Sequence, residues 1–151
     1  METIVIIKSK HTDIMEKIQV YVQWCDKNFG ATLGDNVPGA VVLTAKTYAE
    51  LQHEVPETLR FHVEGMVEDG DDVPQWLRDG DYEFEYDLAD VTTMLRAFGD
   101  DLTLSAISRA TGINQRQLSH YANGLKVPRP QQRQRIVDGI HSIGRRLMAV
   151  V

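Results

Sequence analysis

The sequence predicts an α+β protein in which a strand-rich N-terminal domain precedes an all-helical C-terminal domain. Apolar and polar residues alternate at 18–25 and again at 82–88, which is the period of a half-buried strand. From Asp90 onward the apolar residues recur at helical spacing to the end of the sequence. This change of period predicts domains at residues 15–88 and 89–151.

Three strands are expected at the start of the N-terminal domain. The alternating segment IQVYVQWC gives the first, and turn-forming residues at 26–30 lead into a short second strand at 29–33. The tight turn between these strands predicts a hairpin. A Pro-Gly pair at 38–39 marks a loop before the third strand, VVLT at 41–44.

A helix is expected next, followed by a fourth strand. Thr47 and Glu50 form a capping box, and apolar residues recur at helical spacing from Tyr48 to Met66. Pro56 lies inside this pattern and is expected to kink or split the helix, because proline lacks a backbone N–H. After an acidic loop, the strictly alternating segment YEFEYDL predicts a strand that is antiparallel or lies at an edge of the sheet.

Four helices are expected in the C-terminal domain, and the last of them starts near Pro130. In the third helix, Gln117 stands three residues after the capping residue, which is the capping-box position. The capping residues are Asp90, Thr103 and Asn114, and the helix stops are Gly99, Gly112 and Asn123-Gly124. The residues expected on the apolar face of the last helix are Ile136, Ile140, Ile143 and Leu147.

The charged residues divide the chain at the same place as the change of period. Residues 1–87 hold 7 Lys and Arg against 18 Asp and Glu, a net charge of −11. Residues 88–151 hold 9 against 4, a net charge of +5, so the overall charge of −6 hides two opposite halves. This asymmetry indicates a basic module for a polyanion joined to an acidic module, with two solvated surfaces as the alternative.

Composition excludes several classes of protein. An apolar content of 42% with 25% charged residues is typical of a globular chain and excludes wholesale disorder. The single Cys25 excludes an internal disulfide framework, and we interpret it as a buried small residue. No apolar run approaches the roughly 18 residues of a membrane helix, and the first residues do not follow a signal-peptide pattern. We therefore expect a cytoplasmic protein with no membrane partner and no cofactor.

The C-terminal domain contains a pattern typical of DNA binding. The stretch LTLSAISRATGINQRQLSHYANG at 102–124 predicts a helix, a Gly-containing turn and a second helix, which is the arrangement that carries the later helix into a major groove. The small residues Ser108 and Gly112 let the two backbones approach closely at the turn. A helical hairpin with a solvated polar face is the alternative interpretation.

The second of these helices carries a polar stripe that can read bases. Gln115 with Ser119, and Arg116 with His120, are four residues apart and share one face. Glutamine can pair bidentately with adenine and arginine with guanine. The DNA-binding candidates, with Lys126 and Arg129 as phosphate contacts, are Thr103, Asn114, Gln115, Arg116, Gln117, Ser119, His120, Lys126 and Arg129.

Two resemblances to known families follow from these motifs. The series Ile107-Ser108, Gly112-Ile113, Leu118-Ser119, Gly124 and Pro128 resembles the Xre/Cro-type helix-turn-helix family, with Ser108 where alanine is commoner. The front half resembles the HicB antitoxins over residues 18–66, and a subset of HicB proteins carries a C-terminal helix-turn-helix. This resemblance implies a partial, inactive RNase H-like β-β-β-α-β N-terminal domain followed by an all-α helix-turn-helix domain.

The HicB resemblance also implies a function and partners. The front domain would bind and inhibit a HicA-like ribonuclease toxin, and the rear domain would repress the shared operon by binding operator DNA. We expect a homodimer or a higher even-numbered oligomer. Residues 1–14 lie outside the resemblance and are either an upstream translation start, which we favour, or an extra strand, TIVII.

Acidic residues are the candidates for toxin binding, and the apolar face of the last helix is the candidate dimer interface. Gly144 in that helix would permit close approach of two helices. The toxin-binding candidates are Asp69, Asp71, Asp72, Glu83, Glu85 and Asp87, and the dimer candidates are Ile136, Ile140, Ile143 and Leu147.

Two other functions compete with this one. An enzyme would need metal-binding carboxylates, but the acids of the fourth strand share a face without an identifiable partner and the histidines lack metal-ligand spacing, so we expect no enzyme. The alternative is a one-component transcription factor with a small-molecule-sensing N-terminal domain. No Gly-rich phosphate loop or Cys/His cluster indicates a ligand class for it.

Overall fold

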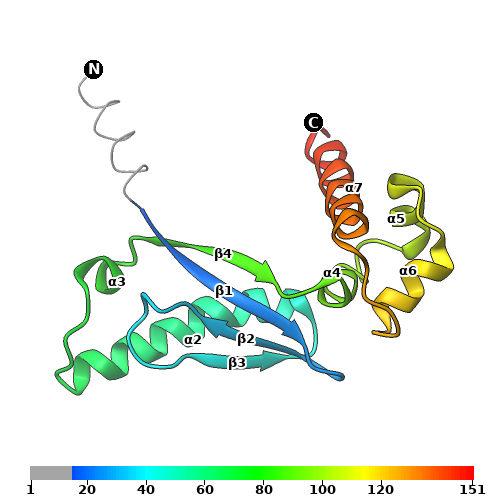
Figure 1. Ribbon diagram of the computed structural model, residues 1–151. Helices are drawn as coiled ribbons and strands as arrows, with labels where there is room; N and C mark the ends of the chain where they lie inside the picture. Colours follow the sequence, from blue (N-terminus) through cyan, green and yellow to red (C-terminus); the bar gives the residue numbers. More distant parts are fainter. Residues whose placement is uncertain (1–14) are drawn as a thin grey trace. The chain divides into compact units, whose positions relative to one another are not determined.

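The computed structural model describes residues 15–151 and has an α+β architecture. In this part of the chain, a four-stranded mixed sheet is accompanied by six helices (Figure 1). The chain divides into two compact units, one holding residues up to Val22 together with 29–87, and the other holding 23–28 together with 88–151. The turn between the first two strands therefore groups with the helical unit. The strand considered for TIVII lies outside the described residues.

The sheet has the strand order β3-β2-β1-β4. β2 and β3 pair antiparallel with Phe29 opposite Ala45, and the backbone N–H of Cys25 donates to the carbonyl of Asn28 in the β1–β2 turn at 2.7 Å. These positions confirm the first three strands and the hairpin. The strands are β1 (Glu16–Trp24), β2 (Phe29–Leu33), β3 (Val42–Ala45) and β4 (Tyr82–Leu88).

The fourth strand lies at an edge of the sheet, which is one of the two alternatives that its pattern predicts, and it is not antiparallel to its neighbour. β4 runs parallel to β1: the N–H of Glu16 donates to the carbonyl of Asp81 at 3.3 Å, and Lys17 and Gln19 farther along β1 reach Glu85. The helix between β3 and β4 returns the chain to the end of the sheet where β1 begins. A strand that starts there must run in the same direction as β1.

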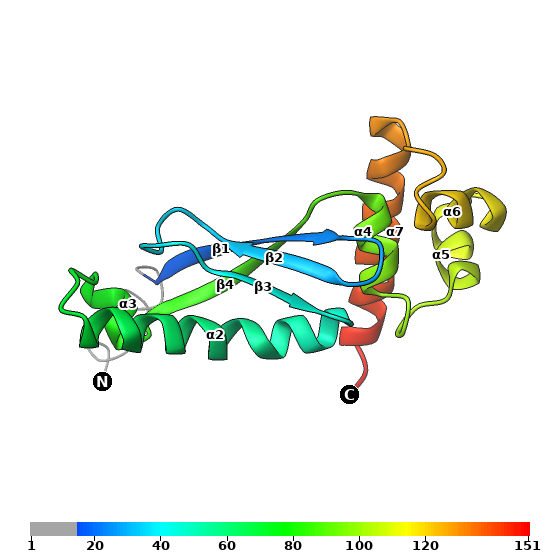
Figure 2. The same cartoon turned by 90° about the horizontal axis from the view of Figure 1, so that it is seen from below.

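Helix α2 (Tyr48–Glu68) covers one face of the sheet (Figure 2). Its N-cap Thr47 accepts a hydrogen bond from the N–H of Glu50 at 3.1 Å. The helix is not split at Pro56, because this residue and Gln52, whose carbonyl loses its helical partner, are both exposed to water. The residues that α2 buries are Tyr48, Leu51, Val55, Leu59 and Val63.

The short helix α3 (Gln75–Asp79) was not predicted from the sequence. It ends at Gly80, whose φ of 73° lies in the left-handed region. Leu77 anchors α3 with 2% of its surface exposed, and the Trp76 ring makes an edge contact with Tyr82 on β4. Five residues are too few to establish a helical period, so α3 could not be found by spacing.

Apart from the last residues of β1, all described secondary structure of the second unit is helical. Asp90, Thr103 and Asn114 cap the first three helices through side-chain oxygens that accept backbone N–H groups, as predicted. The helices are α4 (Val91–Ala97), α5 (Leu104–Thr111), α6 (Gln115–Ala122) and α7 (Pro130–Met148). The buried cluster that joins them consists of Val91, Met94, Leu95, Ile107, Ile113, Leu118, Tyr121 and Ile136.

Two further expectations about single residues need correction. Leu147 is not buried in its own unit but has 63% of its surface exposed, because α7 continues past the helices that cover its earlier turns. Gly144 has open space around it, so the approach of a second helix there stays a prediction, and within the unit the buried Gly139 brings the backbone of α7 close to Thr111 of α5. Cys25 is exposed in the β1–β2 turn. None of the helices in residues 15–151 combines the length and hydrophobicity that a membrane crossing requires.

Candidate nucleic-acid interface

The turn between α5 and α6 is fixed by two hydrogen bonds from small residues. Gly112 adopts a φ of 72°, and its N–H donates to the carbonyl of Ser108 at 2.8 Å. The Ser108 hydroxyl donates in turn to the carbonyl of Ile113 at 2.6 Å. A small residue without a hydroxyl group, such as alanine, could not make the bond to Ile113. Serine therefore has a specific structural role at the position where alanine is commoner in the family that the sequence resembles.

The C-terminal end of α6 is held by α4 through contacts that sequence reasoning missed. Thr92 donates from its hydroxyl to the carbonyl of Tyr121 at 2.7 Å. Arg96 donates from Nε to the carbonyl of Ala122 at 2.9 Å and from Nη2 to Asn123 Oδ1 at 3.0 Å. These donors satisfy carbonyls at a helix end, which otherwise lack partners. Thr92 and Arg96 belong to no motif, so no local signal in the sequence predicted these contacts.

The predicted reading stripe lies on α6 with unequal exposure. Gln115 and Arg116, in the first turn, are exposed, whereas Ser119 and His120 are half-buried. His120 has its Nδ1 atom buried without a hydrogen-bond partner among the described residues. The exposed start of α6 is therefore the part of the stripe that can reach another molecule.

Two of the predicted DNA-binding residues serve as helix caps. Asn114 Oδ1 accepts the N–H of Arg116 at 2.8 Å, and Thr103 Oγ1 accepts the N–H of Ala106 at 3.0 Å. Both side chains are exposed, but their acceptor oxygens already have a partner inside the chain. Their first role in this unit is to begin α6 and α5.

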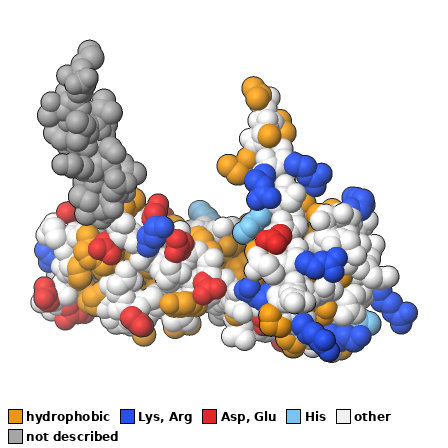
Figure 3. All heavy atoms as spheres, turned by 45° about the horizontal axis from the view of Figure 1, so that its top comes forward, with side chains coloured by type: hydrophobic (Ala, Val, Ile, Leu, Met, Phe, Trp, Pro, Cys, Tyr) orange, Lys and Arg blue, Asp and Glu red, His pale blue; other side chains and the backbone are white. Residues whose placement is uncertain are grey.

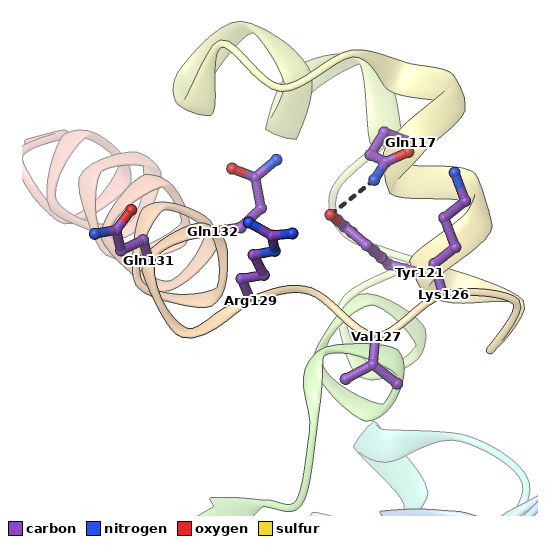
Figure 4. A pocket seen from close by; sticks show the side chains of 7 residues that line it. All are labelled: Gln117, Tyr121, Lys126, Val127, Arg129, Gln131 and Gln132. Carbon is purple, nitrogen blue, oxygen red and sulfur yellow. Dashed lines mark hydrogen bonds between the residues drawn. The ribbon is translucent and has the colours of Figure 1, made fainter.

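Gln117 does not complete a capping box. Its amide nitrogen donates to the Tyr121 hydroxyl at 2.9 Å, one helical turn farther along α6 (Figure 4). Residues four apart in a helix lie on the same face, so the amide can reach along the helix instead of back to its start. This bond orients Gln117 toward a pocket beside α6.

The pocket has a volume of about 480 Å³ and lies between α6, the following loop and the start of α7. Figure 4 shows Gln117 and Tyr121 on one side and Arg129, Gln131 and Gln132 on the other. No acidic residue lines it. Hydrogen-bond donors and two cations make this lining suited to an anion such as a phosphate group. The lining residues are Gln117, Tyr121, Lys126, Val127, Arg129, Gln131 and Gln132.

The Lys and Arg side chains of the second unit outnumber its acids and form no salt bridge with a described residue. All salt bridges between described residues join pairs in the first unit. Arg96 and Arg135 donate to backbone carbonyls instead, and Arg109 donates to the Ser105 hydroxyl. On the face drawn in Figure 3, Lys and Arg predominate over the helical unit and Asp and Glu over the sheet unit. An uncompensated basic surface attracts a polyanion.

The acidic candidates of the first unit fall into two groups with different surroundings. Glu85 accepts from Lys17 Nζ at 3.1 Å and also from Gln19, and Glu83 lies 4.0 Å from the same Lys17. The hydrogen bond from Lys17 lowers the pKa of Glu85. Asp87 is exposed at the end of the same strand.

The second group is the loop after α2. Asp69, Asp71 and Asp72 are exposed and form no salt bridge with any described residue. In residues 15–151, no three His, Cys, Asp or Glu side chains lie close enough together to hold a metal ion.

The four dimer candidates are divided between the core and the surface. Ile136 and Ile143 are buried within their own unit, and Ile140 is partly buried against the same cluster. Leu147 is exposed together with Met148, which has 86% of its surface exposed. Of the four dimer candidates, only Leu147 therefore offers an exposed side chain to a second molecule.

Comparison with known proteins adds no relative. No protein-family model, curated protein or solved structure matches the chain.

Proposed function

We propose that this protein is the antitoxin of a HicA/HicB-type toxin-antitoxin pair. It neutralises a small ribonuclease toxin in the cytoplasm and represses its own operon by binding operator DNA. The observation that carries the DNA-binding part is the exposed start of α6, with Gln115 and Arg116, beside a donor-lined pocket with Lys126 and Arg129. In this proposal α5 and α6 act as a helix-turn-helix, Gln115 and Arg116 contact bases, and the pocket receives a backbone phosphate.

The antitoxin part is supported by the sheet unit and by its charge. A three-stranded antiparallel meander, a covering helix and a fourth strand parallel to the first are compatible with a partial RNase H-like domain. Residues 1–87 carry a net charge of −11, which favours a basic protein partner and disfavours nucleic acid at this unit. A nuclease toxin that binds RNA must itself carry a basic surface, and this surface is complementary in charge to the acidic sheet unit.

The deciding experiment reads the neighbouring gene for a small basic open reading frame and co-expresses its product with this chain; absence of such a frame would favour the one-component transcription factor. We expect rescue of cells that express that protein, and co-purification of the two products. The full chain should also bind a duplex from its own promoter, with an affinity that falls steeply as salt rises, because neutralised phosphates release counterions. Promoter binding without rescue or co-purification would favour the one-component transcription factor instead. Absence of promoter binding would overturn the repressor function.

A further inference from the structure

We propose that the pocket between the end of α2 and α3 is the docking site through which the first unit holds a basic protein. An apolar side chain of that partner would enter the pocket, and its Lys and Arg residues would face the acids at the rim. This inference rests on the proposed antitoxin function and deepens it, because it assigns the partner to one of two acidic surfaces.

The pocket has a volume of about 440 Å³ and an apolar floor. Val63 and Val67 supply the floor from α2, and Val67 has 43% of its surface exposed although its neighbour in the pocket is nearly buried. Glu64 and Glu68 stand on the same helix, and Arg78 of α3 closes the other side. The volume is larger than an aliphatic or aromatic side chain needs.

The wall opposite α2 is firmly attached, so the pocket is preformed. Leu77 of α3 is 2% exposed and Val73 before it is 6% exposed, which places both among the core residues. Both Figures 1 and 2 show α3 at the end of the sheet where α2 ends. A preformed apolar pocket receives an anchor residue without an ordering cost, as in the best-packed positions of protein interfaces.

The rim charges are available to a partner. Glu64 and Glu68 continue into Asp69, Asp71 and Asp72, and none of the five forms a salt bridge with another described residue. Arg78 is the single cation among residues 64–87, against ten acids. Unpaired acids around an apolar centre have the usual arrangement of an interface, with a dry core and a charged rim.

Two of the three acids of the rival surface, on β4, are already engaged. Lys17 and Gln19 donate to Glu85, and Lys17 also lies beside Glu83. A partner that used these carboxylates would first have to displace Lys17. Nucleic acid is excluded as the occupant of the α2–α3 pocket by charge repulsion from the rim.

The test measures binding of the full chain to the purified small basic protein encoded next to it. Val67→Trp fills the pocket without changing charge, and Glu64→Gln with Glu68→Gln removes two rim charges at nearly constant shape. The matched control is Glu83→Gln with Asp87→Asn, which removes two charges from the exposed face of β4. Because Val67 and all four carboxylates are partly or fully exposed, each variant is expected to fold, which thermal unfolding checks.

We expect Val67→Trp to weaken binding about tenfold or more, mainly through faster dissociation, because the anchor loses its pocket. The Glu64/Glu68 variant should slow association several-fold at low salt and lose this effect at high salt, since screening acts over about 8–10 Å. The β4 control should bind within about twofold of the wild type, because rim charges far from an interface contribute little.

Three results would overturn the assignment. Binding of Val67→Trp at wild-type strength excludes the pocket. If the tryptophan variant unfolds, Val67→Lys is measured instead, because it also fills the pocket and places a positive charge beside Glu64 and Glu68. If the β4 control loses more binding than the Glu64/Glu68 variant, the docking site lies on β4. If the pocket variants change self-association of the chain at low salt and leave binding of the basic protein intact, the occupant of the pocket is a second copy of this chain. Failure of the wild type to bind the neighbouring protein is a separate outcome that rejects the proposed function itself.

Discussion

Arg96 Nε donates to the carbonyl oxygen of Ala122 at 2.9 Å, and this bond ties the last turn of α4 to the last turn of α6. The same guanidinium group reaches Asn123 and lies 5.2 Å from the centre of the Trp24 ring. A cation at the C-terminal end of a helix is also favourable to the helix dipole. One side chain thus fixes the helix proposed to read DNA at the end that lies away from its exposed first turn.

Replacing Arg96 should destabilise the second unit. Arg96→Ala removes the donor to Ala122 and the cation over Trp24, and we expect a loss of about 1–2 kcal/mol in the free energy of unfolding. Urea unfolding followed by circular dichroism measures it. Arg116→Ala is the control, because Arg116 is exposed and should change stability by less than about 0.5 kcal/mol. Equal stability of the two variants would show that the contacts of Arg96 contribute nothing.

Arg116 and Lys126 should differ in their effects on DNA recognition. Arg116→Ala should weaken operator binding by about 1–3 kcal/mol and relax preference at one base position, since a bidentate base contact is lost. Lys126→Ala should weaken all sequences to a similar extent and reduce the salt dependence, because a phosphate contact has no sequence information. Titration of operator and scrambled duplexes at two salt concentrations separates these effects. If Lys126→Ala relaxes the base preference and Arg116→Ala weakens all sequences alike, Lys126 contacts the base and Arg116 contacts the phosphate.

Two glycines of α7 should respond oppositely to alanine. A Cβ at Gly139 would clash with Thr111 Cγ2 on α5, so Gly139→Ala should cost about 1–3 kcal/mol. Nothing lies within 4 Å of a Cβ at Gly144, and Gly144→Ala should stabilise the helix by up to about 1 kcal/mol. Thermal unfolding of both variants gives the comparison. A stabilised Gly139→Ala would mean that α5 and α7 are less tightly packed than described.

Local signals account for the elements that the sequence predicts, and longer-range contacts account for those it does not. Thr47, Asp90, Thr103 and Asn114 cap helices because their oxygens bond N–H groups two or three residues away, which spacing alone reveals. The direction of β4 instead depends on where α2 returns the chain. Its alternating pattern is the same in either direction.

The candidate site shows the same division. The exposure of Arg116 follows from the helical period, because it stands two residues before the buried Leu118 and therefore on the opposite side of the helix. Gln115 stands three residues before Leu118, and it is exposed at the first position of α6. The partner of Gln117, the bond from Ser108 to Ile113 and the contacts of Arg96 each join groups whose positions are set by the packed fold. The pocket beside α6 combines Lys126 with Gln132 across a loop. Gln117, Lys126 and Arg129 were predicted as DNA contacts, whereas Gln131 and Gln132 of the same lining were not.

Tyr48 should titrate well above ordinary tyrosines. Burial, with a smaller contribution from Tyr86, raises the pKa of Tyr48 from 10.0 to about 12. The folded state therefore retains a proton that the unfolded state loses, so this contribution to stability is complete below pH 10 and is lost as pH rises toward 12. Phenolate absorbance should show a last transition that Tyr48→Phe removes, although burial also raises the pKa of Tyr82 and of Tyr86. If Tyr48→Phe instead removes a transition near the ordinary tyrosine pKa, the Tyr48 ring is solvated.

The end of α7 should hold two copies of the chain together. Leu147 and Met148 are 63% and 86% exposed, and Val150 follows at 78%, so this apolar surface has no cover within its own unit. A repressor of the proposed type gains affinity by placing two recognition helices on half-sites about one helical turn apart. Leu147→Asp with Met148→Asp should therefore give a monomer in sedimentation at micromolar concentration, with weaker operator binding.

The control is Val42→Asp, because Val42 on β3 is an equally exposed apolar residue, and this variant should stay dimeric. Leu147 and Met148 lie outside the buried cluster, so the melting temperature of the monomeric variant should be nearly unchanged. A dimer that survives the double substitution would place the interface elsewhere, and a wild type that sediments as a monomer would remove the requirement for one.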